Sequence, residues 1–345
     1  MSYQIGIDTI HLRPTPRLAH TEYCDHAPLK RAVTGLPEGH PDLEREFARL
    51  WEYDFLWSTT NDPVPWETRG RMTDMGHSEY DEGGVDRREP TACPFRTVEE
   101  ALALDAVAEY GLTDFDFLVR DYQRRYDAAR AAHPEQVWTG GYYRTLVSGA
   151  IAILGWDVLL QAAAYPDRFA RVLDGIYRQS MHHYLAWAET SIEVFMCHDD
   201  MVWTMGPFLR PDFYRAEIFP RYAALWDVLK RAGKKVVFTS DGDFSMFVDD
   251  IVAAGADALC FEPMTALEPV VAKYGQTHCI LSSKVDARTL TFGSRDDIRA
   301  EIDASLEQAR RCKGFLFAVG NHMPANIPID NALFYMEYLR ANWAR

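Results

Sequence analysis

VVFTSDGD, residues 236–243, contains the transition that indicates the fold of this chain. Its first residues are β-branched and aromatic, as in a buried strand. The apolar run stops at TSDGD, and an apolar pattern with helical spacing then extends over Phe244–Ala253. A strand, a polar turn and a helix in this order form the repeating unit of α/β folds. The two carboxylates beside the glycine belong either to a tight turn without further purpose or to the rim of an active site.

The same unit recurs along most of the chain. The predicted strands are Leu18–Tyr23, Tyr53–Thr59, Val137–Tyr143, Ile192–Cys197, Lys235–Phe238, Ala258–Phe261, Cys279–Ser282 and Phe315–Val319. The predicted helices are Leu146–Ala164, Phe169–Glu189, Pro211–Arg231, Phe244–Ala253, Leu267–Tyr274 and Asp296–Arg311. Strands that alternate with helices pair in parallel through right-handed crossovers. Two strands before residue 60 and six after residue 135 make eight, the number in a closed (β/α)8 barrel.

The length of 345 residues fits a single α/β domain over residues 1–345, a (β/α)8 TIM barrel with an N-terminal extension. A loop insertion is expected around residues 61–96, because this stretch is rich in Pro, Gly and charge and weak in periodicity. The insertion is either a lid over the substrate or a surface excursion. Trp66, Met72 and Met75 favour the lid.

The composition is that of a globular protein, with 48% hydrophobic and 25% charged residues. The net charge of −15 and the lack of a basic block argue against nucleic acid as a partner. No apolar run is long enough to cross a bilayer and the N-terminus lacks a secretory pattern, so we expect a cytoplasmic protein. Six cysteines lie far apart without a C-x-x-C pair, which predicts reduced thiols rather than disulfides or a zinc ribbon.

The carboxyl ends of the predicted strands form the candidate site, because barrel enzymes carry their chemistry there. The residues at these ends are Glu22, Tyr23 and nearby His26; Ser58, Thr59, Thr60 and Asp62; Gly140–Arg144; His198, Asp199 and Asp200; Thr239–Asp243; Glu262; Lys284 and Asp286; and Asn321 and His322. One charged loop is weak evidence of function. Carboxylates that converge on one barrel mouth, however, must repel one another, bind a cation or shift their pKa values.

Roles follow from the chemistry of these side chains. The catalytic candidates are Asp241, His198, Glu262 and Tyr143, and the candidate ligands of a divalent metal such as zinc are His198, Asp241 and Glu262. The expected substrate-binding residues are Glu22, Trp57, Tyr142, Arg144, Asn321 and His322. Simpler interpretations stay open: the residues around His198 also suit a solvated turn, those around Asn321 a plain loop, and one of Tyr142 and Tyr143 the core.

Several motifs add a family resemblance. GPFLRPDFYRAEIFPRY, a strand that closes in F-x-x-D-G, FEP, SKVDARTL and GNHMPANIPIDN follow one another in an order that resembles the uroporphyrinogen decarboxylase superfamily. The resemblance extends from about Arg17 to the end of the chain and is best after Gly206. It implies a (β/α)8 barrel. It also implies either decarboxylation or corrinoid-dependent methyl transfer, because the superfamily contains both kinds of enzyme.

The resemblance to the decarboxylases themselves is incomplete. Their arginine pair, which holds the carboxylates of the substrate, has no counterpart in HTEYCDH, residues 20–26. Their catalytic aspartate corresponds to a position near Thr59, with Asp62 close by, and their late histidine corresponds to Asn321. An acid-rich mouth also disfavours a polycarboxylate. Uroporphyrinogen is therefore not the expected substrate.

The methyltransferase branch is similar in a different way. Members that activate a thiol with zinc carry H-x-C on the fifth strand and a cysteine on the last, where this chain has Thr239, Asp241 and Asn321. The resemblance without these two motifs implies a methyltransferase that moves a methyl group from a small O-, N- or S-methylated compound to a corrinoid. The corrinoid would be a cobalamin presented by a separate corrinoid-binding protein.

Two other functions stay open from the sequence. One is a cofactor-independent decarboxylase of an aromatic or pyrrolic acid, in which Lys284, Arg144 and Arg69 hold the carboxylate and Asp241 protonates the carbanion. The other is a binding protein without catalysis. In each case we expect a small-molecule ligand, no membrane partner, and a monomer or homodimer.

Overall fold

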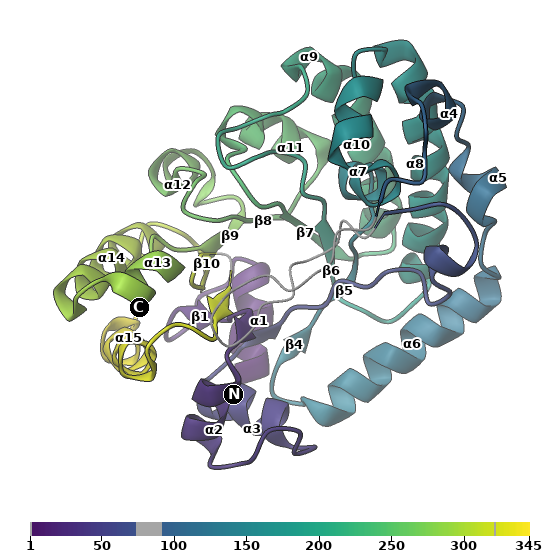
Figure 1. Ribbon diagram of the computed structural model, residues 1–345. Coiled ribbons are helices and arrows are strands. Elements are labelled where there is room, and N and C mark those ends of the chain that lie inside the picture. Colours follow the sequence, from purple (N-terminus) through teal and green to yellow (C-terminus); the bar gives the residue numbers. More distant parts are fainter. Residues whose placement is uncertain (1, 74–91, 321) are drawn as a thin grey trace.

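A ring of strands surrounded by helices forms the centre of the molecule (Figure 1). The computed structural model of the chain describes residues 2–73, 92–320 and 322–345. The strands are β1 (Ala19–His20), β2 (Cys24–Asp25), β3 (Phe55–Leu56), β4 (Val137–Trp138), β5 (Gly140–Tyr142), β6 (Val194–His198), β7 (Lys235–Thr239), β8 (Ala258–Cys260), β9 (Cys279–Ser282), β10 (Gly314–Phe317) and β11 (Met323–Pro324). The α-helices are α1 (Ser2–Ile10), α2 (Ala27–Thr34), α3 (Leu43–Leu50), α4 (Val98–Leu102), α5 (Ala106–Tyr110), α6 (Phe115–Ala132), α7 (Val147–Ala162), α8 (Pro166–Ala188), α9 (Pro211–Phe213), α10 (Phe219–Arg231), α11 (Val248–Ala254), α12 (Leu267–Tyr274), α13 (Ala287–Phe292), α14 (Arg295–Ala309) and α15 (Ile329–Asn342). Short 3-10 helices η1 (Trp66–Thr68) and η3 (Ser245–Phe247) and the π-helix η2 (Tyr214–Ile218) complete the elements.

Backbone hydrogen bonds run around the ring. Seven strands form one parallel sheet in the order β1-β10-β9-β8-β7-β6-β5. Strand β4 precedes β5 by the single residue Thr139 and pairs in parallel with β3. The N–H of Asp54, at the start of β3, donates to the carbonyl of His20 in β1 at 2.8 Å. With β4 and β5 taken as one strand, β3 is the eighth member of the ring, and the predicted (β/α)8 barrel is confirmed.

Alternation along the strands creates two apolar clusters, because successive strand side chains point to opposite faces. An inner cluster fills the ring and contains Ala19, Phe55, Val137, Val194, Met196, Val237, Ala258, Cys260, Cys279, Leu281, Leu316 and Ala318. The residues between them, such as Phe195 and Cys197 of β6, belong to the larger cluster that includes the helices. The position of a residue relative to the inner cluster therefore decides whether its side chain reaches the barrel mouth.

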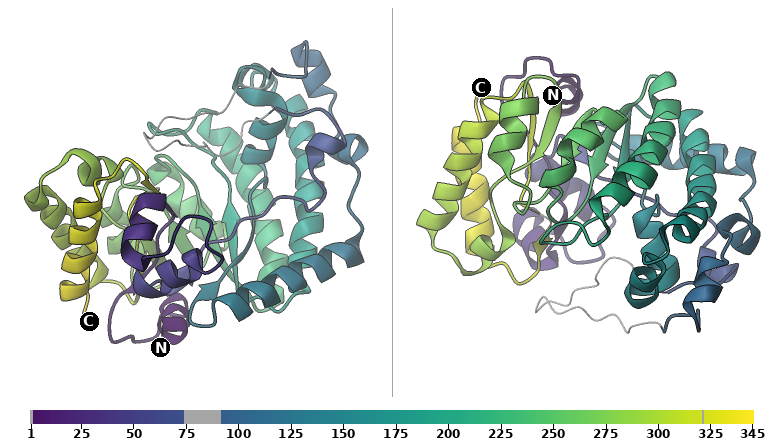
Figure 2. Two further views of the ribbon diagram at one scale, coloured as in Figure 1. Left: turned by 60° about the horizontal axis from the view of Figure 1, so that its bottom comes forward. Right: turned by 90° about the horizontal axis from the view of Figure 1, so that it is seen from above.

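The N-terminal extension is helix α1, which closes the amino end of the ring. Ile7 and Ile10 of α1 belong to the inner cluster, and Tyr3, Ile5 and Leu12 pack against it. The N and C labels lie near each other in both views of Figure 2, and the segment after α1 contacts the C-terminal segment, where Leu18 donates to the carbonyl of Trp343 at 2.9 Å. With its amino end closed, the ring carries its site at the carboxyl ends of the strands.

One predicted helix is broken in the structure, and several observed helices were not predicted. The segment Pro211–Arg231 consists of α9, the π-helix η2 and α10 rather than one helix. Pro220 stands in the first turn of α10, where it lacks the N–H that a continuous helix would need. Helices α1 to α6, α13 and α15 were not among the predicted helices.

Part of the expected insertion lies outside the described residues, namely 74–91, which include Met75. Its first part, residues 61–73, packs against neighbouring helices. Trp66 is fully buried and stacks on Tyr110 of α5 with a centroid distance of 4.8 Å, and Thr73 donates to the carbonyl of Ala152 in α7 at 2.7 Å. The lid function of the insertion stays a prediction.

The cysteines and the helices can be compared with two expectations from the sequence. All six cysteines are free thiols, and four of them are buried. Among the described helices, none combines the length and the apolar character that crossing a membrane requires.

Candidate active site

Two hollows lie at the carboxyl ends of the strands. The larger, here called the chamber, has a volume of about 340 Å³ and is lined by Tyr23, Trp57, Ser58, Thr59, Met196, His198, Thr239 and Asp241. The smaller, here called the recess, has a volume of about 30 Å³ and is lined by Trp57, Thr239, Ser240, Asp241, Cys260, Phe261, Glu262, Leu281, Ser282, Ala318 and Val319. The volume of the chamber lies in the range of small-molecule sites, about 300–1,000 Å³.

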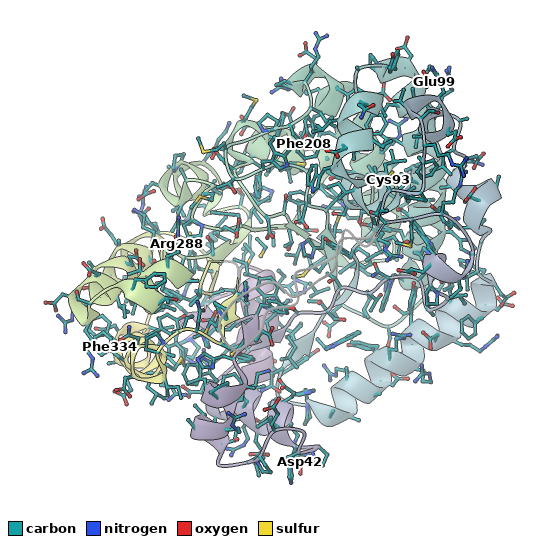
Figure 3. All side chains as sticks on the ribbon, in the orientation of Figure 1. Asp42, Cys93, Glu99, Phe208, Arg288 and Phe334 are labelled. Carbon is teal, nitrogen blue, oxygen red and sulfur yellow. The ribbon has the colours of Figure 1, made fainter. Side chains whose placement is uncertain are left out.

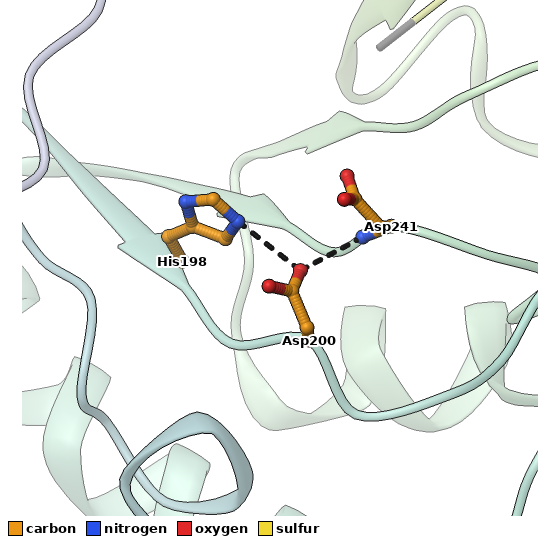
Figure 4. Close-up of side chains that lie close together, drawn as sticks. All are labelled: His198, Asp200 and Asp241. Carbon is orange, nitrogen blue, oxygen red and sulfur yellow. Dashed lines mark hydrogen bonds and ion pairs between the residues drawn. The ribbon is translucent and has the colours of Figure 1, made fainter. Parts of the chain in front are cut away.

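A cluster of ionisable side chains stands at the wall of the chamber (Figure 4). Ligand atoms of His198, Asp200 and Asp241 all lie within 4.8 Å of one another. His198 Nε2 is 3.1 Å from Asp200 Oδ1, and the same oxygen accepts the backbone N–H of Asp241 at 3.1 Å. The second oxygen of Asp200 accepts the hydroxyl of Tyr143 at 3.1 Å. Asp200 thus connects the side chains of Tyr143 and His198 with the backbone of Asp241, at the ends of β5, β6 and β7.

Strand alternation explains why these residues meet. His198 follows Met196 of the inner cluster by two positions, so it continues the inward-facing side of β6. Asp241 follows Val237 by four positions and lies on the same face. Glu262 follows Cys260 by two positions, and it lines the recess.

The TSDGD turn has both a structural and a site role. Gly242 has a φ of +81°, and a Cβ at this position would lie 2.5 Å from the carbonyl oxygen of Trp203. Its N–H donates to Glu262 Oε2 at 2.7 Å. Asp243 instead accepts the N–H of Ser245 at 2.9 Å and lines neither the chamber nor the recess. The glycine therefore allows the tight turn that brings Asp241 and Glu262 to adjacent walls.

Asp199 points to the opposite side from its neighbours and anchors helix α7. Its buried carboxylate accepts the N–H groups of Leu146, Val147 and Ser148 at 3.1, 3.1 and 2.6 Å, and the hydroxyl of Tyr222 at 2.6 Å. Burial raises the pKa of Asp199 to about 6, although these hydrogen bonds oppose the rise. The anchor fixes the loop after β6, which holds Asp200.

The electrostatics of the cluster favour protonated donors. Burial by itself would lower the pKa of His198, but the Asp200 carboxylate, with Asp241 and Asp199 farther away, outweighs it, and the net pKa is raised. Burial, followed by the charge of Asp200, raises the pKa of Tyr143 well above its usual value. His198 therefore keeps its proton to a higher pH than a free histidine, and Tyr143 stays a hydroxyl donor.

Comparison with known proteins identifies the family. Residues 156–341 match the family model described as uroporphyrinogen decarboxylase (URO-D). The chain belongs to the uroporphyrinogen decarboxylase family. The resemblance inferred from the sequence motifs is therefore confirmed.

Two known proteins are similar to this chain, one in sequence and one in structure. A uroporphyrinogen decarboxylase of Pelobacter propionicus is 23% identical over 172 residues, which are 50% of this chain and 48% of that protein. The chain thus matches about half the length of this curated relative. A methyltransferase from Methanosarcina mazei has a similar structure, with a TM-score of 0.67, 17% identity and coverage of 99% of both chains. At this identity the second likeness establishes the fold.

The candidate catalytic residues of this family member lie together. Asp241, His198 and Tyr143 belong to the cluster on Asp200, and Glu262 stands across the Gly242 turn at the recess. Trp57 lines both hollows. Among the described residues, the group of three with metal-ligand spacing contains Asp200 in place of the predicted Glu262.

Three expected substrate-binding residues lie outside both hollows and contact other parts of the protein. Glu22 is buried, accepts the N–H of Val319 at 2.8 Å and is also bonded to the hydroxyl of Tyr335. Tyr142 is fully buried, and its ring stacks on that of His183 in α8 at 4.5 Å. The third, Arg144, pairs with Glu67 at 2.7 Å. None of the three lines the chamber or the recess.

Two further candidates lie on the segment after β10. Asn321 is outside the described residues. The His322 ring lies 6.1 Å from that of Tyr23, which lines the chamber. The segment that carries His322 continues into β11, which pairs with β2 at the rim.

Asp200 is the site residue that sequence reasoning left out of the assigned roles. The run HDD after β6 contains the signal. Because an extended chain alternates, His198 and Asp200 share one side and Asp199 takes the other. Applied past the end of the strand, the alternation rule would have selected Asp200 for the site and Asp199 for the core.

Proposed function

We propose that this chain is a methyltransferase that binds a small O-, N- or S-methylated compound in the chamber and passes its methyl group to a corrinoid. The acceptor is a cobalamin presented by a separate corrinoid-binding protein. The proposal rests on the hydrogen-bonded group of His198, Asp200 and Tyr143. His198 of this group lines the chamber, which has the size of a small-molecule site. The family resemblance supports the reaction class.

The side chains of the cluster suit the proton chemistry of demethylation. When the bond between the methyl carbon and its heteroatom breaks, the electron pair stays on the heteroatom, which then needs a proton or a positive charge. The Asp200 carboxylate holds Nε2–H of His198, so the imidazolium can donate from Nδ1 to the leaving heteroatom. Tyr143 supports Asp200 through its hydroxyl. Reduced cobalamin supplies the nucleophile for this chemistry.

The same cluster fits a divalent cation as an alternative source of positive charge. One imidazole and two carboxylates are ligands that zinc accepts, and their ligand atoms already lie within 4.8 Å of one another. His198, Asp200 and Asp241 would hold the ion. A cation there supplies Lewis acidity toward the leaving heteroatom.

Zinc binding provides the first test. We expect calorimetric titration of the purified, chelator-treated protein with Zn²⁺ to give a dissociation constant that rises about tenfold or more in both His198→Ala and Asp241→Ala. Each change removes one of three candidate ligands. Asp243→Ala, which alters a carboxylate outside both hollows, should bind zinc as the unchanged protein does. Equal zinc binding in all four proteins would contradict the metal site and leave the acid role of His198.

Methyl transfer provides the second test. We expect the protein to convert chemically reduced cob(I)alamin to methylcobalamin, followed by visible absorption, with at least one of a panel of methoxyarenes, methylamines and methyl thioethers. His198→Gln should slow the reaction about 100-fold or more, because it removes the acid and keeps the size of the side chain. No conversion with any donor, in the presence of a corrinoid-binding protein as well as free cobalamin, would contradict the proposal.

A carboxy-lyase is the second candidate, favoured by the name of the matching family model. The cations expected to hold its carboxylate are engaged elsewhere: Arg144 with Glu67 at 2.7 Å, Arg69 with Asp62 at 3.3 Å, and Lys284 with Glu268. None of these cations lines the chamber or the recess. Release of carbon dioxide from an aromatic or pyrrolic acid without cobalamin, abolished by Asp241→Asn, would favour this candidate over methyl transfer.

A further inference from the structure

The side chain of Trp57 lines both hollows of the barrel mouth. Trp57 follows Phe55 of the inner cluster by two positions, and its side chain packs against that cluster. It lines the chamber together with Met196 and His198 of β6, and it lines the recess together with residues of β8, β9 and β10. Trp57 therefore borders both hollows, as Thr239 and Asp241 also do, and its indole lies where the two hollows adjoin.

The indole is held in place by hydrogen bonds rather than by deep burial. Its Nε1–H donates to Thr21 Oγ1 at 2.8 Å, and the Thr21 hydroxyl donates to the carbonyl of Phe55 at 2.7 Å. Thr21 follows β1 and Phe55 belongs to β3, so the pair of bonds fixes the ring across two adjacent strands. The ring is a rigid plate, but Trp57 is only partly buried and is not one of the residues that fill the core.

The wall between chamber and recess also offers a polar anchor. Thr239 lines both hollows, and its buried hydroxyl contacts the thiol of Cys260. A hydroxyl both donates and accepts, so it can also bond a polar group of a ligand. A ring with a polar substituent therefore has both an apolar surface, Trp57 and Met196, and a polar contact, Thr239, in the chamber.

We propose that Trp57 is the specificity-determining residue that sets the size limit of the substrate. The indole confines the ligand to the chamber and keeps it out of the recess, whose deeper wall is made by Cys260, Leu281 and Ala318. This inference rests on the proposed function for the chemistry of the substrate. The size limit itself follows from the chamber and the recess and does not depend on that reaction. A smaller residue at position 57 joins the hollows and favours longer ligands over short ones.

The test uses two probes of graded size, phenol and 2-naphthol, titrated into the full chain by calorimetry. The measured quantity is the ratio of the dissociation constant of phenol to that of 2-naphthol. We expect this ratio to rise about tenfold in Trp57→Ala, because the second ring gains an apolar recess to fill. Trp57→Phe makes the ring smaller, and Thr21→Val removes the hydrogen bond that holds the indole. Both changes should raise the ratio by less than Trp57→Ala does.

Trp203→Ala is the matched control, because it removes a tryptophan at the rim that lines neither hollow. Trp203 packs on Phe208, labelled in Figure 3, with a centroid distance of 5.5 Å. The ratio should stay unchanged in this variant. Circular dichroism verifies folding of each variant; if Trp57→Ala does not fold, Trp57→Phe and Thr21→Val decide by the sign of their shift.

Three results would overturn the inference. They are an equal change for both probes in the Trp57 and Thr21 variants, the same shift in Trp203→Ala, and failure of either probe to bind any of the proteins. The titrations contain no methyl donor and no cobalamin. A shifted ratio without methyl transfer would therefore reject the proposed reaction and keep the size limit, whereas methyl transfer with an unshifted ratio would do the opposite.

Discussion

Asp200→Asn is expected to lower kcat/KM for methyl transfer by about 10²- to 10⁴-fold, the range for loss of acid–base assistance. The change keeps the shape of the side chain and removes its charge. Asp200 contacts three groups of the site, namely His198 Nε2, the Tyr143 hydroxyl and the N–H of Asp241. Without the carboxylate, the imidazolium loses its main stabilising charge and its fixed orientation. Steady-state formation of methylcobalamin measures the loss.

The pH profile gives an independent check on Asp200. The pKa of His198 is raised in the folded protein, with Asp200 as the main favourable charge, so the acid form persists to higher pH. In Asp200→Asn the alkaline limit of activity should move to lower pH, because the imidazole then loses its proton earlier. Asp243→Asn should change neither the rate nor the profile. A loss of less than threefold in Asp200→Asn would contradict the central role of this carboxylate.

Asp54→Ala is expected to lower the free energy of unfolding by about 3–5 kcal/mol, as for other buried charges that lose their partner. The Asp54 side chain is fully buried and pairs with Arg17 through two hydrogen bonds of 2.6 and 2.8 Å. It also accepts the N–H of His20 at 2.9 Å. These contacts lie where β3 meets β1, so the change removes the side-chain bonds at this junction, while the backbone N–H of residue 54 still donates to His20. Urea denaturation followed by circular dichroism measures the difference.

A matched surface pair calibrates this loss. Asp8 pairs with Arg13 at 3.3 Å, with 57% of the arginine side chain exposed, and Asp8→Ala should cost about 0–1 kcal/mol. Replacing Arg17 by Met in addition to Asp54→Ala should recover part of the stability, because no unpaired charge then remains. Equal losses in Asp54→Ala and Asp8→Ala would refute the closing role of Asp54.

The strands of the barrel were predictable because their signals are local. A β-rich run that ends in polar residues is visible in the sequence at each of the predicted strand positions, and each contains or overlaps an observed strand. The assignment of individual side chains to the mouth required one more step. Val137 of the inner cluster sets the alternation of its strand, so Tyr143 faces the mouth and Tyr142 the helices.

Other features of the site depend on contacts between distant residues. Glu22 stands near the end of a strand, like the true mouth residues, but its carboxylate is bonded to Tyr335, 313 positions along the chain. The sequence predicts Arg144 and Lys284 as anion-binding residues. In the structure each of them pairs with a carboxylate of another segment. No local pattern encodes such pairings, because they arise from the packing of the complete barrel.

The closure of the amino end by α1 has a consequence for biosynthesis. Ile7 and Ile10 share the inner cluster with Leu316 and Ala318, so the first and last parts of the barrel complete the same interior. During translation the apolar face of α1 is covered only after β10 has left the ribosome. Contacts between residues so far apart in sequence slow folding and prolong exposure to chaperones.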